Sequence, residues 1–161
     1  MEVAKIVELI SDKFPTAILE QEMEVKQPFI VLEVGLLPEI AEFCLKDERL
    51  YFDFLHCISG VDLGEAKGQL EVVYHLSSLI HEHQLVCKVR TDRAVPEPIP
   101  SVSAVWKSAN WHEREAYDLL GIPFADHPDL RRILLPDDWE GNPLRKDYVE
   151  AEEYRDIKIK Y

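Results

Sequence analysis

The chain has 161 residues, 47% of them hydrophobic and 30% charged, a composition typical of one globular domain with a single core. Its formal net charge of −13 disfavours binding to nucleic acid and direct adsorption to anionic lipid. No run approaches the ~20 apolar residues of a membrane-spanning helix, and the N-terminus lacks the pattern of a secretory signal. We therefore expect a cytoplasmic protein that reaches a membrane only through a partner.

The three cysteines lie far apart in the sequence. Cys44, Cys57 and Cys87 show no C-x-x-C spacing, which disfavours a disulfide framework and a zinc site. Iron–sulfur clusters usually take four thiolates, so this chain alone is not expected to hold one. Each cysteine has apolar neighbours, and we predict buried thiols.

The first 95 residues show the periodicities of both helices and strands. Apolar residues recur at helical spacing over residues 3–14 and again over 36–48, where Pro38 lies near the expected helix start. Four runs rich in β-branched and aromatic residues are predicted strands: 29–34, 51–63, 68–78 and 83–91. Short connections between the last three favour antiparallel pairing. The predicted fold class is α+β, a small and mostly antiparallel sheet covered on one face by helices.

The sequence changes character near residue 95. Pro96, Pro98 and Pro100 hold the backbone extended and remove hydrogen-bond donors. We interpret residues 1–95 as an α+β domain. Residues 96–161 are interpreted as a C-terminal docking segment of the same single-domain subunit, with a short helix followed by an extended arm.

The short helix is predicted from capping residues. Asn110 is the expected N-cap, with Glu113 three residues later as in a capping box, and Gly121 is the expected residue past the helix end. Arg114 and Asp118 are four residues apart, which places them on one face as an exposed ion pair.

Residues 122–148 are predicted to be extended, because four prolines and a Gly-Asn-Pro turn forbid a long helix. So long a segment without regular structure is typical of a functional or partner-bound element. It combines planar cations with apolar anchors, the residue types enriched at protein interfaces. They are Phe124, Leu130, Arg131, Arg132, Ile133, Leu134, Leu135, Trp139 and Arg145. The composition predicts a binding arm.

The run WHEREAYDLLGIPFADHPDLRRILLPDDWEGNPLRKDY resembles the signature region of one family of respiratory complex I proteins, the 30 kDa hydrophilic subunit of NADH:quinone oxidoreductase. The matching positions are Glu113, Arg114, Glu115, Tyr117, Asp118, Gly121, Ile122, Phe124, His127, Pro128, Leu130 to Leu134, Asp137 to Gly141, and Pro143 to Tyr148. Two positions depart from the family pattern. Asp126 stands where Gly is frequent, which bears on a turn needing positive φ, and Val149 stands where Pro is frequent.

The resemblance implies a non-catalytic assembly subunit in the peripheral arm of a proton-translocating NADH:quinone oxidoreductase. It implies no cofactor in this chain, with FMN and iron–sulfur clusters in partner subunits. The implied partners are the large quinone-site subunit and the cluster-bearing subunits, at the cytoplasmic side of the inner (plasma) membrane. The implied partner-binding residues are Glu113, Arg114, Glu115, Asp118, His127, Arg131, Arg132, Asp137, Asp138, Trp139, Arg145, Lys146 and Asp147.

Other interpretations remain open at this stage. Related subunits occur in membrane-bound hydrogenases and in dehydrogenases with other electron donors. A different class is a free-standing acid–base enzyme that uses Glu113, Asp118 and His127, which would need carboxylates facing each other across a cleft. The His81-Glu82-His83 and Asp137-Asp138 pairs are weak metal candidates, and we favour turns at both places.

Overall fold

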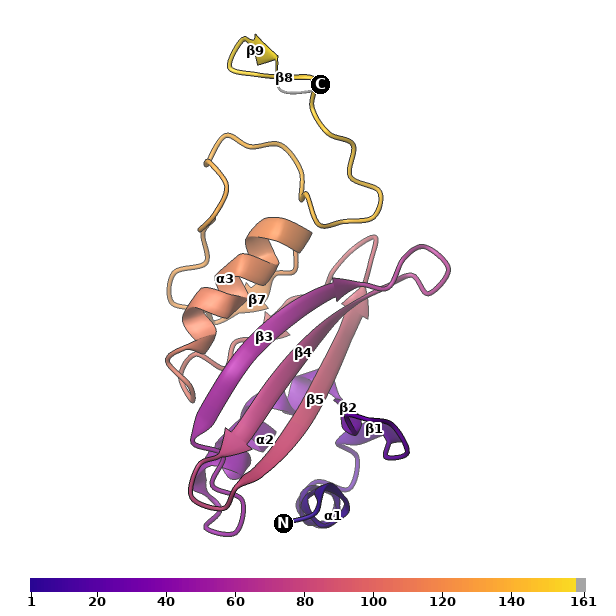
Figure 1. Ribbon diagram of the computed structural model, residues 1–161, viewed down its shortest axis with the longest axis vertical. Coiled ribbons are helices and arrows are strands. Elements are labelled where there is room, and N and C mark those ends of the chain that lie inside the picture. The colour runs from indigo at the N-terminus through magenta and orange to yellow at the C-terminus, as the bar shows by residue number, and fades with distance from the viewer. Residues whose placement is uncertain (159–161) are drawn as a thin grey trace.

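The computed structural model describes residues 1–158, in which helices pack against a five-stranded sheet (Figure 1). The elements in chain order are α1 (Val3–Lys13), β1 (Ile18–Glu22), β2 (Phe29–Leu32), the 3-10 turn η1 (Val34–Leu36), α2 (Leu37–Lys46), β3 (Phe54–Asp62), β4 (Gln69–Ser78), β5 (His83–Asp92), β6 (Ile99–Pro100), α3 (Ala109–Leu120), β7 (Phe124–Ala125), β8 (Glu153–Tyr154) and β9 (Ile157–Lys158). The α+β prediction is confirmed.

The sheet has the strand order β1-β2-β5-β4-β3. Strands β3, β4 and β5 form an antiparallel meander, as predicted from their short connections. Strand β2 pairs in parallel with β5, and β1 pairs antiparallel with β2 at the far edge. Strand β1 was not predicted, because its residues ILEQE are mostly polar and largely exposed.

The core lies on one face of the sheet, where helices cover it (Figure 1). Alternate residues of β4 enter this core, namely Leu70, Val72, Tyr74 and Leu76, as a period-2 strand with one buried face requires. The core does not end near residue 95. It continues through α3 and adjoining residues that share the same cluster: Ile99, Val102, Trp106, Ala109, Ala116, Leu120, Ile122 and Phe124.

Close packing of α3 on the sheet depends on Gly60 in β3. A Cβ atom at this position would lie 2.4 Å from Leu120 Cδ1 and 3.3 Å from Ile122 Cδ1. Contacts that short force neighbouring atoms to shift. The missing side chain therefore leaves the space against β3 that Leu120 and Ile122 fill.

The other face of the sheet carries a network of charged side chains. Glu71 forms ion pairs with Lys88 (3.1 Å) and Arg90 (2.8 Å). Arg90 forms a second ion pair with Glu20 (2.7 Å). Lys88 Nζ lies 3.8 Å from the centroid of the Phe29 ring. One face of this mixed sheet is therefore apolar and the other largely polar.

The cysteines follow the prediction in part. Cys44 and Cys87 are buried, and burial raises the pKa of the Cys44 thiol to about 12 and that of Cys87 well above its usual value. Cys57 is only half-buried, on the polar face, with its Sγ 3.4 Å from His75 Nδ1. All three are free thiols.

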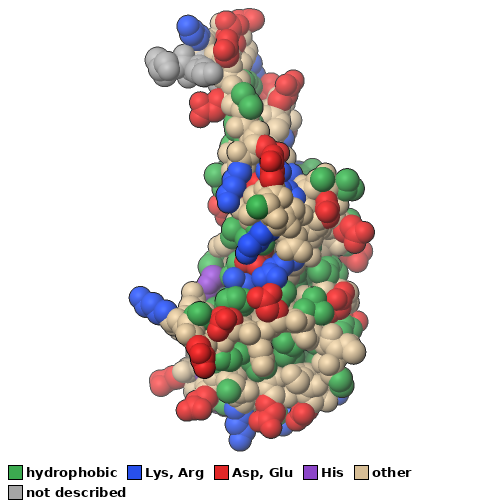
Figure 2. All heavy atoms as spheres, turned by 90° about the vertical axis from the view of Figure 1, so that its right-hand side faces the viewer, with side chains coloured by type: hydrophobic (Ala, Val, Ile, Leu, Met, Phe, Trp, Pro, Cys, Tyr) green, Lys and Arg blue, Asp and Glu red, His purple; other side chains and the backbone are tan. Residues whose placement is uncertain are grey.

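Residues 126–152 form neither helix nor strand and lead away from the sheet as a narrow extension (Figure 1). We call this extension the arm. At its end β8 and β9 form a small antiparallel hairpin. Figure 2 shows Lys and Arg side chains gathered near the junction of this extension with the compact body. Within residues 1–158 no helix has the length and apolar character needed to cross a membrane.

Candidate partner interface

Helix α3 begins before its expected cap. It starts at Ala109, Asn110 lies inside its first turn, and the N-cap Ser108 makes no side-chain bond, so the predicted Asn110–Glu113 capping box is wrong. Donors from a neighbouring segment bind Glu113 instead. The predicted end is confirmed, because Gly121 has φ +71° and its N–H donates to Tyr117 O.

Glu113 points into the protein and has no exposed surface. Its Oε1 accepts the Val102 N–H (2.8 Å), and its Oε2 accepts the Ser101 hydroxyl (2.6 Å). His127 Nε2 lies 3.8 Å from Oε2. That imidazole donates from Nε2 to Asn110 O (3.1 Å) and accepts the Asp129 N–H at Nδ1 (3.0 Å). The nearest polar contacts of the ring are therefore backbone groups rather than the carboxyl of Glu113.

Burial controls the ionisation of Glu113. Desolvation raises the pKa of its carboxyl to about 7, although the bonds from Ser101 and Val102 oppose the shift. The Tyr74 hydroxyl, which is buried and has no hydrogen-bond partner among the described residues, has its pKa raised by burial and then by the charge of Glu113. Glu113 therefore has the perturbed pKa of a catalytic acid without access to solvent.

We expect Glu113→Gln to stabilise the protein at pH 8 by about 1–3 kcal/mol. Between pH 4.5 and pH 7 the carboxyl of Glu113 keeps its proton in the folded protein but loses it in the unfolded chain. The free energy of unfolding of the wild type therefore falls as pH rises from about 4.5 to about 7. The amide has no charge to desolvate, and its Nε2 can donate to the Ser101 hydroxyl. Urea unfolding at pH 5 and pH 8 measures both effects. Equal slopes against pH in the two proteins would contradict the assignment.

Asp118 is the centre of a second buried cluster. Its Oδ2 accepts the N–H groups of Ile133 (3.0 Å), Leu134 (2.8 Å) and Leu135 (2.9 Å), and its Oδ1 accepts Arg132 Nη1 (2.7 Å). Burial alone would raise the pKa of Asp118, but these four donors outweigh it and hold the pKa below its usual value. One carboxylate thus fixes three consecutive residues of the arm to α3.

Arg114 also binds the arm. It is 8% exposed, and its guanidinium donates to Arg131 O (3.1 Å) and Arg132 O (3.0 Å). The predicted exposed Arg114–Asp118 pair is therefore wrong. Both side chains are buried, because each finds partners on the backbone that returns past α3 after residue 130.

Arg132 links two parts of the arm to each other and also links the arm to α3. Besides Asp118, it donates from Nη2 to Trp139 O (3.0 Å) and Gly141 O (3.2 Å). Asn142 Nδ2 donates to Asp118 O (3.0 Å). Planar donors with several N–H groups suit this bridging of carbonyls.

A third cluster binds the arm to the end of β3. Arg93 bonds both oxygens of Asp62 (2.8 and 3.0 Å) and also reaches Asp147 (2.9 Å). Asp62 Oδ2 accepts the Lys146 N–H (2.8 Å). Arg145 donates to Arg93 O (2.7 Å) and to the last carbonyl of α3 (2.8 Å). Arg93 and Asp62 were missed by sequence analysis because they lie outside the resembling run.

The His81 and His83 pair has a structural role. His81 Nε2 bonds Glu48 O (2.8 Å) and His83 Nε2 bonds Leu50 O (2.7 Å), with the two rings stacked at 5.5 Å. Residues 1–158 contain no group of three or more metal-ligating side chains. The two histidines fix the segment between α2 and β3.

The family model of the 30 kDa subunit of respiratory-chain NADH dehydrogenase matches residues 30–154. The chain belongs to this family. It is 48% identical over 155 residues to an NADH-quinone oxidoreductase subunit of Chloroherpeton thalassium, covering 95% of this chain but only 63% of that longer relative. The corresponding subunit of Chlorobium phaeobacteroides is 44% identical over 156 residues, covering 96% of this chain and 93% of the relative.

The fold also occurs in a solved respiratory complex. A chain of the membrane-bound sulfane sulfur reductase, an archaeal respiratory membrane complex, superposes with a TM-score of 0.74 at 21% identity. The alignment covers 97% of this chain and 98% of that one. At this identity the likeness shows a shared fold.

The family's signature positions fall into two groups here. Glu113, Arg114, Asp118, His127, Arg132 and Arg145 hold the chain's own segments together. The exposed members are Glu115, Arg131, Asp137, Asp138, Lys146 and Asp147. Trp139 is half-buried against Tyr154, with ring centroids 5.3 Å apart. Contact of these residues with a partner stays a prediction.

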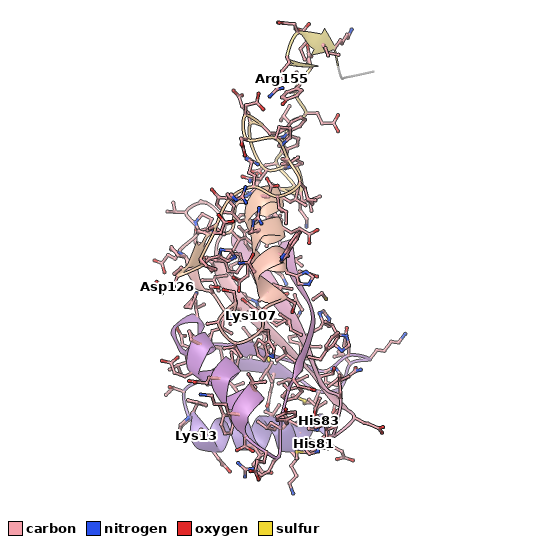
Figure 3. All side chains as sticks on the ribbon, turned by 90° about the vertical axis from the view of Figure 1, so that its left-hand side faces the viewer. Lys13, His81, His83, Lys107, Asp126 and Arg155 are labelled. Carbon is pink, nitrogen blue, oxygen red and sulfur yellow. The ribbon has the colours of Figure 1, made fainter. Side chains whose placement is uncertain are left out.

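Asp126 keeps the backbone that the family's glycine implies. It follows β7 and has φ +58°, in the left-handed region. Figure 3 labels its position. Aspartate tolerates this region better than most residues. The departure from the family pattern therefore leaves the turn in place.

Proposed function

We propose that the chain is a non-catalytic assembly subunit in the peripheral arm of an NADH:quinone oxidoreductase, docked on the quinone-site and iron–sulfur subunits. The observation that carries the proposal is the arm. Buried Asp118 and Arg114, together with partly buried Arg132, hold it in one shape, yet it presents apolar side chains outward: Leu134 (62% exposed), Leu144 (59%) and Val149 (81%). Exposed apolar side chains on a segment that buried hydrogen bonds hold in one shape support a surface that a partner covers.

The burial of the candidate acid–base group argues against a free-standing enzyme. The side chains of Glu113, Asp118 and His127 have no exposed surface. A substrate would have to displace the arm to reach them. Their hydrogen bonds to the backbone also account for their presence without chemistry. We propose that FMN, iron–sulfur clusters and the cytoplasmic-side membrane attachment belong to partner subunits.

A second candidate differs only in the electron donor. The shared fold with a chain of a sulfane sulfur reductase shows that this fold also occurs in a respiratory complex other than an NADH-quinone oxidoreductase, which keeps open a complex with another donor, such as a hydrogenase. The identity of 48% to an NADH-quinone oxidoreductase subunit favours NADH. Capture of the tagged chain from membranes of its source, with subunits identified by mass spectrometry, decides between them through the donor-side subunits recovered.

We expect the double variant Leu134→Asp with Leu144→Asp to reduce recovery of partner subunits at least about tenfold. Burial of each leucine is worth ~1.5–3 kcal/mol, and a buried new charge costs more. The matched control is Leu79→Asp with Ile80→Asp, equally exposed (64% and 69%) at the β4–β5 turn. Figure 3 shows this end, marked by His81 and His83, opposite Arg155 at the end of the arm. Normal recovery with both double variants would exclude the arm as the docking surface.

A further inference from the structure

Strand β3 ends the sheet with a free edge. It is the last strand in the order, and its outer side pairs with no other strand of residues 1–158. The Leu63 N–H donates to Gln69 O (3.1 Å), and antiparallel bonds recur at every second residue. The backbone groups of Ser59 and Val61 therefore face β4, and those of Ile58 and Gly60 face outward. The regular part of β3 thus has three outward-facing residues, Ile58, Gly60 and Asp62, whose backbone groups pair with no other strand of residues 1–158, and Gly60 is the most exposed of the three.

The two edges of the sheet differ in how they are protected. Edge strand β1 is five residues long, carries Glu20 and Glu22, and has an irregular register, all features that prevent further pairing. Strand β3 is nine residues long and has neither lysine nor proline. Its register shift lies at its start, between Leu55 and Cys57, so the pairing from Ile58 onward is regular. From Ile58 onward, β3 therefore has less of the usual protection of an edge than β1.

A cavity of about 200 Å³ adjoins the free edge of β3. Its lining includes Ile58 and Gly60 from the strand, Leu119 and Glu115 from α3, and Leu144 from the arm. Glu115 and Leu119 continue a stripe that begins four residues earlier at Trp111, which is 66% exposed. A strand added beside β3 would lie over this stripe, as β3 itself lies over the buried side of α3.

We propose that the edge of β3 accepts an extended segment of another subunit, which adds a sixth strand to the sheet. An apolar side chain of that segment fills the cavity beside Gly60, and a basic side chain lies opposite Glu115, which forms no ion pair with any described residue. Backbone pairing at an exposed edge, combined with a side-chain pocket, is an established mode of peptide recognition. This inference rests on the proposed assembly role and adds a second contact beside the arm.

The occupant is another subunit rather than a second copy of this chain. Leu144 belongs both to the apolar side chains of the arm and to the cavity, so the edge continues the proposed docking surface. Two copies paired through β3 would bring two carboxylates of Glu115 toward one interface. Each copy also carries a net charge of −13, which opposes self-association.

Hydrogen exchange resolved to single amides tests the inference in the assembled complex and in the purified chain. We expect the amides of Ile58 and Gly60 to exchange at least about 100-fold more slowly in the complex. The amides of Ser59 and Val61 are already paired with β4 and change little. This alternation distinguishes strand addition from burial of a surface.

Leu119→Glu is expected to lower partner recovery about tenfold while the circular dichroism stays unchanged.

Three outcomes would overturn the inference. If the arm residues near Leu144 gain protection in the complex and Ile58 and Gly60 do not, the edge is free and the assembly role stands. If partner subunits are not recovered at all, the assembly role itself fails. If both edge amides are already slow in the purified chain and speed up on dilution, the occupant is a second copy.

Discussion

Asp118→Asn is expected to release the arm and to lower the free energy of unfolding by about 3–5 kcal/mol. The asparagine oxygen can face either the three N–H groups of residues 133–135 or Arg132, and its NH₂ then opposes donors on the other side. Amide exchange at Ile133, Leu134 and Leu135, followed together with urea unfolding, measures both effects. Because ionised Asp118 is the stabilising form, the wild-type contribution is lost as pH falls through its lowered pKa.

The control for this variant is Asp129→Asn. Asp129 is 52% exposed and pairs with Arg131, itself 70% exposed, so its loss is expected to change stability by less than about 0.5 kcal/mol. Unchanged exchange at residues 133–135 in Asp118→Asn would show that the arm is held by other contacts.

Arg93→Met is expected to destabilise the protein by about 3–5 kcal/mol, because it leaves Asp62 buried without its cation. The side chain of Asp62 is 1% exposed, and the hydrogen bonds from Arg93 are the main reason that its pKa lies far below the usual value. Methionine keeps much of the volume of the arginine stem. Thermal and urea unfolding give the magnitude, and Arg131→Met serves as the exposed control.

The double variant Arg93→Met with Asp62→Leu separates two causes of that loss of stability, the unpaired buried charge of Asp62 and the weaker attachment of the arm. Removal of both charges leaves no unpaired buried ion, so most of the stability should return. The N–H groups of Gly64 and Lys146 would still lack their acceptor, and attachment of the arm at residues 145–147 should stay weak. A double variant no more stable than Arg93→Met would show that the ion pair is not the source of the effect.

The periodic elements could be predicted from sequence, and the exposed edge strand could not. Helices α1 and α2 and strands β3 to β5 carry their apolar residues at regular spacing. Strand β1 is largely exposed along its five positions, so local hydrophobicity gives no signal. Its place depends on β2, whose pairing with β5 spans more than fifty residues and cannot be read from local pattern.

The residues of the candidate site were predicted, but whether their side chains face the core or the solvent was not. Charged residues on a short helix normally face solvent, and this expectation placed Arg114 and Asp118 outside. A signal was available for Glu113. It lies at helical spacing between Ala109, Ala116 and Leu120, which define the buried stripe of α3. The acceptors and donors on residues 101–102 and 131–135 come from distant segments, which only the folded structure brings together.

The contact between Asp62 and Lys146 joins residues 84 positions apart. Contacts of such separation close late, because the loop between them must be ordered first. During synthesis the sheet up to β5 leaves the ribosome well before residue 146 does, and α3 can pack on Gly60 before the arm has its last anchor. The order of synthesis therefore leaves an interval in which the body is folded and the arm is not yet fastened, and a partner that meets the chain then would find the segment still free to adapt.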